Sequence, residues 1–180
     1  MTAHHPDRPD IEIPPGKDPF PGFDIRYTEA SDAPYLKEWL CEPTVARWFP
    51  MDDEIEIIDA VNRWIGFSRY KCSITATANG VPCGLATLYL NPYKKLAHQC
   101  EFGIVVGKDF RGTGVGRELL RNLFHLAKKF GIEVIHLQVY AENPAIRLYR
   151  RMGFREFGRQ THWIKDQGVY QARLFMERFL

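Results

Sequence analysis

The sequence predicts one α/β (α+β) domain built around a mixed, mostly antiparallel sheet. The apolar run Phe102–Val106 is followed by a glycine-rich turn and an amphipathic run ending at Phe130, the pattern of a strand followed by a helix. A second apolar run, Val134–Tyr140, completes a strand–helix–strand crossover of the kind that joins parallel strands. Turn signals at Asn79-Gly80 and at residues 165–168 indicate a hairpin on either side. We therefore expect a central parallel pair flanked by hairpins, with helices on both faces.

Length and composition favour an ordinary globular protein. The chain has 180 residues, 45% hydrophobic and 26% charged, which suits one domain with a sizeable core. A net charge of +2 gives no reason to expect nucleic acid or a membrane as a partner. No apolar run approaches the roughly 20 residues of a spanning helix, and the N-terminus lacks the apolar core of a secretion signal. A cytoplasmic location is expected.

The N-terminal stretch differs from the rest of the chain. Residues 1–22 hold six of the twelve prolines and no periodic pattern, which is typical of a flexible arm. One domain is expected over residues 23–180. The four cysteines show no Cys-x-x-Cys spacing, so they are interpreted as buried free thiols, and no metal site is predicted.

The first half of the domain is expected to form a strand, two helices and a hairpin. A strand is expected at residues 23–28, and a helix capped by Ser31 or Asp32 runs to residue 40. Residues 42–50 are too interrupted by proline for one helix. A second helix spans about 53–70, with a core face expected at Ile55, Ile58, Val61 and Ile65. Strands follow at 72–78, 81–90 and 98–106.

Acidic residues crowd the start of that second helix: Asp52, Asp53, Glu54, Glu56 and Asp59. Carboxylates at a helix N-terminus complement its dipole, which is a structural explanation. The alternative is an electronegative wall that, with Glu42, recruits a cationic ligand. Both explanations stay open at this point.

The second half carries clear helix boundaries. An apolar stripe spans residues 115–130 and is closed by Gly131 as the residue after the helix. Asn143-Pro144 opens a short helix that Gly153 closes. The last segment is a hairpin of strands at about 155–164 and 170–179.

The run from residue 111 to residue 117 is the main candidate for a binding site, with members Arg111, Gly112, Thr113, Gly114, Val115, Gly116 and Arg117. Its alternating glycines leave backbone N–H groups uncovered at a helix N-terminus, which favours an anion such as phosphate. A P-loop is excluded because Arg117 and Glu118 stand where Lys and Ser/Thr are needed. A dinucleotide fingerprint lacks its third glycine. A solvated turn without ligand is the remaining alternative.

Two motifs together resemble the GCN5-related N-acetyltransferase (GNAT) superfamily. Arg111, Gly114 and Gly116 match its Arg/Gln-x-x-Gly-x-Gly/Ala pattern in register. The run 139–154, with Asn143, then Ala, Leu-Tyr and Gly-Phe, is similar to its second signature. The resemblance covers roughly residues 99–157. The surroundings of Trp39 and of residues 47–49 are similar to the RimJ/RimL-type and aminoglycoside-acetylating branches.

This resemblance implies a GNAT-like fold and acetyl-CoA as cofactor. The parallel strands would splay apart, and coenzyme A would enter the gap with its pantetheine on the main chain of Ile104, Val105 and Val106. Its pyrophosphate would lie on the N–H groups of the 111–116 turn. Asn143 would bond the cofactor's amide arm, cap the following helix, or do both.

Acetyl transfer requires a neutral amine, although an alkyl amine of pKa about 10.4 is almost fully protonated at pH 7. Glu101 is the candidate base, since strand alternation separates it from the face of Cys100 and Phe102. The resemblance also puts the family's base near this position. Tyr149 matches the family's tyrosine, which would protonate the leaving thiolate. His98 and His136 are fallback bases.

The expected function is direct acetyl transfer in a ternary complex, from acetyl-CoA to a primary amine of a small molecule or a protein N-terminus. The alternative is a non-catalytic regulatory domain of the same fold that binds CoA or acyl-CoA. The sequence leaves the acceptor's identity open. It also leaves the oligomeric state open, with a homodimer among the alternatives.

Overall fold

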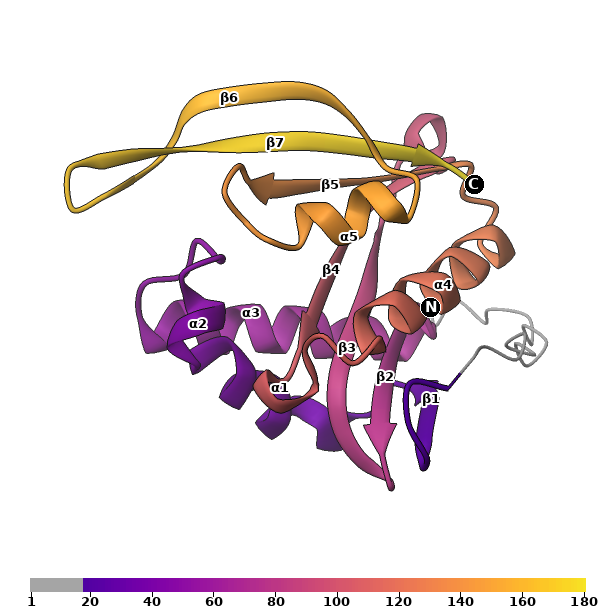
Figure 1. The fold of residues 1–180 in the computed structure, drawn as a ribbon. Coiled ribbons are helices and arrows are strands. Elements are labelled where there is room, and N and C mark those ends of the chain that lie inside the picture. Colours follow the sequence, from indigo (N-terminus) through magenta and orange to yellow (C-terminus); the bar gives the residue numbers. More distant parts are fainter. Residues whose placement is uncertain (1–17) are drawn as a thin grey trace, which may run out of the picture.

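The structure, a computed structural model, describes residues 18–180, which build one seven-stranded sheet in the order β1-β2-β3-β4-β5-β7-β6 (Figure 1). The strands are β1 (Phe23–Tyr27), β2 (Ser73–Ala78), β3 (Val81–Leu90), β4 (Gln99–Val106), β5 (Val134–Tyr140), β6 (Arg155–Asp166) and β7 (Val169–Phe179). The α-helices are α1 (Ala33–Cys41), α2 (Pro43–Ala46), α3 (Glu54–Gly66), α4 (Val115–Lys129) and α5 (Ile146–Arg151). Short 3₁₀ turns are η1 (Ala30–Asp32), η2 (Phe67–Tyr70), η3 (Lys94–Leu96) and η4 (Lys108–Phe110).

The strand pairing confirms the predicted mixed sheet. Every neighbouring pair is antiparallel except β4 and β5, which are parallel. The parallel pairing is short: it joins Gln99–Glu101 to Val134–His136 and ends there. Beyond that point the two strands diverge, and Figure 1 shows the sheet divided into a β1–β4 half and a β5–β7–β6 half. The predicted splay of the central pair is therefore present.

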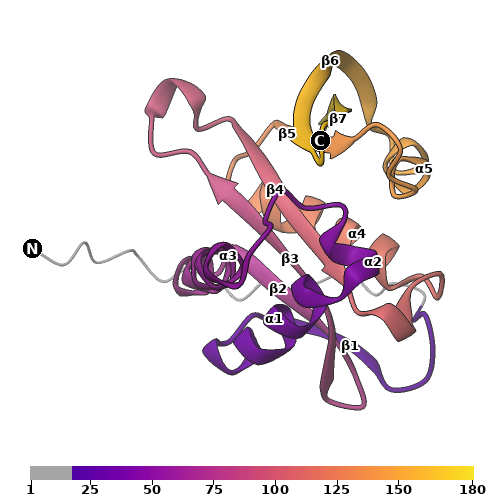
Figure 2. The same ribbon diagram turned by 90° about the vertical axis from the view of Figure 1, so that its left-hand side faces the viewer.

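Helices cover both faces of the first half of the sheet (Figure 2). One face packs against α4, and its core includes Cys100 and Phe102 of β4. The other face packs against α1 and α3, and its core includes Val105 of the same strand. The alternation along β4 thus separates two cores, as the sequence pattern predicted. The stripe predicted on α4 is also confirmed, since Val115, Leu119, Leu120, Leu123 and Ala127 are all fully buried.

The core face of α3 was predicted correctly only in part: Val61 is buried and Ile65 packs against the core, but the two residues predicted before them do not. Ile55 is 79% exposed and Ile58 is 41% exposed, whereas Ile57 and Trp64 are buried. The helix turns its aromatic residue, rather than its first isoleucine, towards the sheet. Trp64 packs edge-on against Phe49 and Tyr89, and this packing fixes the rotation of the helix.

The segment at residues 42–50 does not form one helix, as expected, but it contains a short helix, α2, and the Glu42 side chain accepts a hydrogen bond from the Thr44 N–H. The expectation for the cysteines needs one correction. Cys41 is exposed, whereas the thiols of Cys72, Cys83 and Cys100 are buried as expected.

The predicted N-terminal arm lies outside the described residues for positions 1–17. Its last five residues, 18–22, contact the domain. Phe20 packs against Phe110 with ring centroids 5.8 Å apart, and the Gly22 carbonyl accepts a hydrogen bond from the Asn79 N–H at 2.8 Å. The described chain thus reaches β1 from beside the 111–117 turn.

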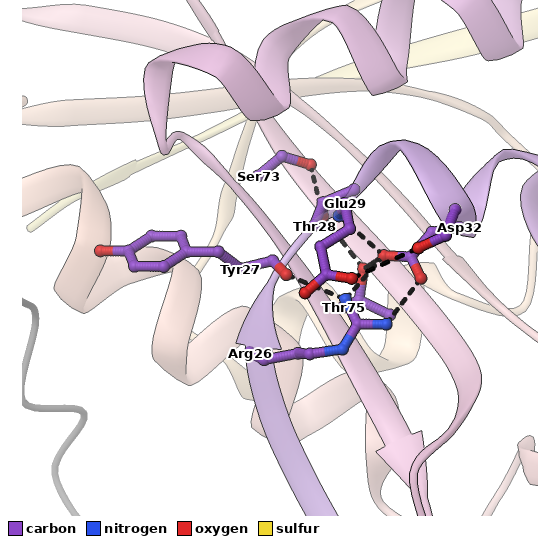
Figure 3. A network of polar contacts seen from close by, with 8 residues as sticks. Arg26, Tyr27, Thr28, Glu29, Asp32, Ser73 and Thr75 are labelled. Atoms are coloured by element: carbon purple, nitrogen blue, oxygen red, sulfur yellow. Dashed lines mark hydrogen bonds and ion pairs between the residues drawn. The ribbon is translucent and has the colours of Figure 1, made fainter.

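A buried polar network ties β1 and η1 to β2 (Figure 3). Asp32 is 1% exposed, and both its oxygens accept hydrogen bonds from the Arg26 guanidinium, at 2.8 and 2.7 Å. The Glu29 N–H and the Thr75 hydroxyl donate to the same carboxylate at 3.0 and 2.8 Å. Burial alone would raise the pKa of Asp32, but these donors hold it below its usual value.

We expect Asp32→Asn to destabilise the fold by about 2–4 kcal/mol, because it leaves the half-buried Arg26 without its counter-charge. The pKa of Asp32 is lower in the folded chain, so its contribution is present above the unfolded value near 3.8 and is lost as pH falls through the folded value. The free energy of unfolding of wild type and of Asp32→Asn is measured with denaturant from pH 7 to pH 3. The difference between the two proteins should become smaller at the acid end. Asp24→Asn, at an exposed position of the same strand, is the control. If Asp32→Asn and Asp24→Asn lose equal stability relative to wild type, the network does not have this role.

Candidate active site

A cavity of about 850 Å³ lies where β4 and β5 separate. Its walls come from the free edge of β4, the facing part of β5, the 111–117 turn, the start of α5 and the α2 segment. This volume falls within the range of small-molecule sites in proteins. The short parallel pairing of β4 and β5 therefore opens a ligand-sized space in the middle of the sheet.

The turn before α4 has the geometry of an anion site. Gly112 and Gly114 have φ of 77° and 107°, a region that L-residues with a Cβ rarely adopt. Within residues 18–180, no backbone or side-chain acceptor bonds the N–H groups of residues 112–116. These donors stand at the positive end of a 15-residue helix. The pyrophosphate of a coenzyme fits these requirements.

Most of the predicted site residues line this one cavity: Ile104, Val105, Val106, Arg111, Gly112, Gly114, Gly116, Arg117, Asn143 and Tyr149. Three do not. Val115 is fully buried in the core, and the Thr113 hydroxyl donates to the Phe110 carbonyl at 2.7 Å, which closes the turn. Glu101 is not a lining residue, but its carboxylate contacts Gln138, which is.

The two arginines of the turn are held by carboxylates. Arg117 Nε donates to Glu118 Oε1 at 3.1 Å, and Glu118 is only 3% exposed. Arg111 bonds Glu42 Oε2 at 3.0 Å, Thr44 Oγ1 at 2.7 Å and the Val106 carbonyl at 3.2 Å. Arg111 therefore joins the end of β4 to the α2 segment across the cavity rim.

The main chain at the cavity offers further polar groups. From Phe102 to Val106, the edge of β4 that faces β5 has no partner strand. Asn143 Oδ1 accepts the Ala145 N–H at 2.9 Å, so this side chain does stabilise the turn into α5. Its amide nitrogen has no hydrogen-bond partner within residues 18–180, and the residue lines the cavity. The Asn143 side chain thus closes the turn before α5, whose N-cap residue is Ala145, and its amide N–H groups remain available.

Tyr149 lies at the inner end of the cavity. Its ring packs edge-on against Phe102 and Phe154, with centroids 6.1 and 5.9 Å apart. Within residues 18–180 its hydroxyl has no hydrogen-bond partner. Burial raises the pKa of Tyr149 above its ordinary value, so the hydroxyl keeps its proton at neutral pH.

Glu101 lies on the opposite face of β4 from Phe102 and Tyr149, at the last paired position before the strands diverge. Burial raises the pKa of this carboxyl, while the charge of Arg173 and a bond from Gln138 act in the opposite direction. His136, a fallback base, is its register partner on β5, and burial lowers the pKa of that imidazole. A carboxyl with a raised pKa beside a cavity has the property required of a general base.

Several residues of the site were missed in the sequence. Trp48, after α2, reaches across the divided sheet to Tyr140 of β5, with ring centroids 6.1 Å apart. Tyr140 in turn packs against Trp163 of β6 at 4.8 Å. Gln138 lines the cavity and bonds Glu101 at 3.5 Å. The aromatic content of residues 42–50 was a usable signal for Trp48, but nothing marked Gln138.

Four of the five acidic side chains at the start of α3 are engaged locally. Asp53 caps the helix at Glu56, whose own carboxylate accepts the Asp52 N–H. The others form ion pairs: Glu54 with Lys37 at 2.7 Å, and Asp59 with Arg63 at 2.5 Å. Glu42 is likewise paired with Arg111. These contacts favour the structural explanation over an electronegative wall for a cationic ligand.

Comparison with known proteins identifies the family. Residues 33–154 match the Acetyltransferase (GNAT) family, more than half of the chain. The chain belongs to the GNAT acetyltransferase family. The predicted fold is confirmed, and the family agrees with the predicted enzyme class, an N-acetyltransferase that uses acetyl-CoA.

Individual GNAT relatives agree with this assignment. The chain is 26% identical over 107 residues to the L-amino acid N-acetyltransferase AaaT of Escherichia coli, a match that covers 58% of this chain and 66% of the relative, just under two thirds. The ribosomal-protein-alanine N-acetyltransferase of Brucella melitensis is 26% identical, with a TM-score of 0.74 over 87% of this chain and 99% of that one. An acetyltransferase of Salmonella typhimurium, yncA, solved with its cofactor acetyl-CoA, shares the fold, with a TM-score of 0.77 at 20% identity over 88% and 94%.

Two further features of the described part of this GNAT chain concern membrane spans and metal sites. No helix there is both long and apolar enough to span a membrane. Residues 18–180 also contain no group of three or more histidine, cysteine, aspartate or glutamate side chains placed to hold a metal ion.

We expect Glu42→Gln to raise the KM for the amine acceptor by roughly 2–5-fold, the range that an exposed ion pair is worth. The reason is that Glu42 and Arg111 hold the α2 segment, from which Val45, Trp48 and Phe49 line the cavity. The dissociation constant for CoA should change less, because the turn N–H groups are untouched. Glu38→Gln, at an exposed position of α1, is the control. Equal KM values in both variants would exclude this role of Glu42.

Proposed function

We propose that this GNAT protein transfers the acetyl group of acetyl-CoA directly to a primary amine in a ternary complex, with Glu101 as base and Tyr149 as acid. The amine belongs to a small molecule or to a protein N-terminus. The observation that carries the proposal is the single cavity that brings the phosphate-type turn, the open edge of β4 and Tyr149 together. Glu101 is hydrogen-bonded to Gln138, one of the residues that line this cavity.

The donor supplies the acetyl group as a thioester, and the residues of the chain divide the remaining tasks. The N–H groups of residues 112–116 hold the pyrophosphate, and the edge of β4 pairs with the pantetheine arm. Main-chain N–H groups near Val105 and Val106 stabilise the charge that develops on the carbonyl oxygen, since the sheet fixes them in advance. Transfer to a bound amine needs both ligands oriented together, which the shared cavity permits.

Proton movements fall to the two side chains on opposite faces of β4. The amine must lose a proton before or during attack, and Glu101 accepts it directly or through water. The leaving thiolate, whose conjugate acid has a pKa of about 8.5, gains from a donor as the C–S bond breaks. Burial keeps Tyr149 protonated, and its hydroxyl has no competing partner within residues 18–180.

The acceptor is best sought among α-amino groups. Two of the three relatives above are named for amino acids and for a ribosomal-protein alanine as acceptors. The local contacts of the acids at residues 53–59 weaken the main argument for a strongly cationic amine. We therefore place amino acids and N-terminal peptides ahead of polyamines and aminoglycosides.

Thiol release from acetyl-CoA tests the proposal. The purified protein is incubated with acetyl-CoA and L-amino acids, a peptide with N-terminal alanine, spermidine, or an aminoglycoside, and free CoA is measured. Amine-dependent release with a mass gain of one acetyl group on the acceptor supports transfer. CoA binding by calorimetry without release for any acceptor would support the non-catalytic regulatory alternative.

We expect Tyr149→Phe to lower kcat by about 10–100-fold, which lies at or below the lower end of the rate effect of a general acid. The change removes one hydroxyl and leaves the packing against Phe102 and Phe154, so KM for both ligands and the melting temperature should stay close to wild type. Steady-state kinetics at saturating acetyl-CoA is the measurement. Unchanged kcat would remove Tyr149 from the mechanism.

A further inference from the structure

We propose that Gln138 and Arg173 are positioning residues that hold the Glu101 carboxylate at the cavity wall and keep it ionised for proton transfer. This inference rests on the proposed function, because it assigns a task to groups that surround the proposed base. Neither residue belongs to the two sequence motifs of the family. The three side chains are called the Glu101–Gln138–Arg173 chain below.

The contacts form a continuous path from β4 to β7. Arg173 Nη1 donates to Gln138 Oε1, and Gln138 Nε2 donates to Glu101 Oε2 at 3.5 Å. Because its oxygen is occupied by Arg173, the amide of Gln138 must turn its nitrogen towards Glu101. Arg173 therefore fixes the orientation of the amide, and this orientation directs the amide N–H towards Glu101.

The sheet register places these groups on one face. Glu101 pairs with His136 in the parallel ladder, so the two side chains point the same way, and Gln138 follows two positions later. Gln138 pairs with Phe175 and Tyr140 pairs with Arg173 in the antiparallel ladder of β5 and β7. The Glu101–Gln138–Arg173 chain thus crosses the strands at the point where β4 and β5 diverge.

Gln138 connects the proposed base with the cavity. Gln138 lines the cavity, whereas Glu101 does not. The Gln138 amide bonds the Glu101 carboxylate, so one side chain contacts both the base and the space in which an amine would bind. The same amide is available to contact the acceptor, so its orientation affects both the amine and the base.

Arg173 is anchored more firmly than a surface cation. Its guanidinium lies 4.9 Å from the Trp163 ring centroid and 4.5 Å from that of Phe175, and its Nε donates to Gln160 at 3.0 Å. A planar fork that stacks on rings and donates in two directions is a property of arginine that lysine lacks. The fixed guanidinium holds a positive charge near Glu101 that offsets part of the desolvation of the carboxylate.

The other titratable groups around Glu101 do not supply this charge. Tyr89, its partner on β3, stays neutral because burial raises the pKa of its hydroxyl. His136, its partner on β5, has a pKa lowered by burial and is uncharged at neutral pH. Arg63 of α3 acts electrostatically on Tyr89, but it is exposed and paired with Asp59. Arg173 is thus the cation that acts on Glu101 from the described elements packed around it.

The test measures the titration of Glu101 directly, without an acceptor. Protein labelled with ¹³C at the glutamate carboxyl is titrated by NMR, and the Glu101 signal is assigned by its absence in Glu101→Gln. We expect the midpoint of Glu101 to move to higher pH in Arg173→Gln and in Gln138→Met. Arg173→Lys should stay closer to wild type, because it keeps the charge. Arg159→Gln removes an exposed charge from the same hairpin and serves as the control.

The outcomes separate this inference from the proposed function. Midpoints that are unchanged in both Arg173→Gln and Gln138→Met, in proteins with wild-type circular dichroism, overturn the inference whatever the catalytic result. An upward shift, together with a rising limb of kcat that moves the same way for a peptide with N-terminal alanine, supports it. If Glu101→Gln retains full acetyl transfer, the base assignment fails even where the midpoints move. An equal shift in Arg159→Gln would assign the effect to net charge and likewise overturn it.

Discussion

Replacing Glu101 by glutamine is expected to lower kcat for acetyl transfer by about 10²–10⁴-fold, the usual worth of a general base. The amide keeps the shape of the side chain and its contact with Gln138 but cannot accept the proton of the amine. CoA binding should persist, because the turn that we expect to hold the pyrophosphate lies at the other end of β4 from Glu101. The measurement is kcat over pH 5–9 with acetyl-CoA and a responsive amine, together with CoA affinity by calorimetry.

The pH dependence of the wild type gives this prediction a second readout. Burial raises the pKa of Glu101, so kcat should rise as pH increases through that value and the carboxylate forms. The same shift means that the ionised group costs stability above its pKa. Glu101→Gln should therefore melt at the same temperature as wild type or higher at pH 8. Glu133→Gln, at an exposed position just before β5, is the matched control. A stable Glu101→Gln protein with near-normal turnover would move the search to His98, His136 or ordered water.

The sheet was predictable because its signals are local. Asn79-Gly80 gives the β2–β3 hairpin, and both residues have positive φ as such a turn needs. The alternation along β4 assigns Phe102 and Val105 to separate cores, as observed. The glycines before α4 predict their own backbone geometry, since few other residues tolerate it. Family resemblance then supplied the splay of β4 and β5, which no local pattern encodes.

The rotation of α3 shows where periodicity is insufficient. Isoleucines occupy three of its first five positions, Ile55, Ile57 and Ile58, so hydrophobicity alone allows more than one face. The face was decided by Trp64, which packs on Phe49 and on Tyr89 of β3. Its ring also fills space beside Gly103, where a Cβ would come within 2.4 Å of Trp64 and 2.3 Å of the Tyr89 hydroxyl. This fit depends on a residue in another strand and was not visible in the helix.

The parts of the site that escaped prediction depend on contacts between distant segments. The link between Glu42 and Arg111 spans 69 positions, and each residue had a sufficient local explanation. Gln138 became identifiable only through the register of β4 and β5, which places it two positions beyond the partner of Glu101. Once a parallel pair is assigned, the polar residues that follow the last paired position are the ones to inspect.

Replacing Gly114 by aspartate is expected to weaken CoA binding by at least about 100-fold. The new side chain brings a negative charge to the N–H groups that we expect to hold the pyrophosphate. Two unit charges about 4 Å apart interact by roughly 4 kcal/mol at the effective dielectric of a protein surface, which exceeds the cost of a hundredfold loss. Calorimetric titration with CoA is the measurement, and acetyl transfer at limiting acetyl-CoA should fall in parallel.

Backbone strain at Gly114 has to be separated from charge, because its φ of 107° is unfavourable for any residue with a Cβ. Gly114→Ala introduces the strain alone and should weaken CoA binding by much less than Gly114→Asp. Gly131→Asp makes the same exchange at the opposite end of α4, where φ is also positive, at 74°, and a Cβ would meet open space. That variant should lose stability without losing affinity for CoA. If Gly114→Asp and Gly114→Ala bind CoA equally well, the phosphate does not lie on this turn, and the site must be sought along the edge of β4.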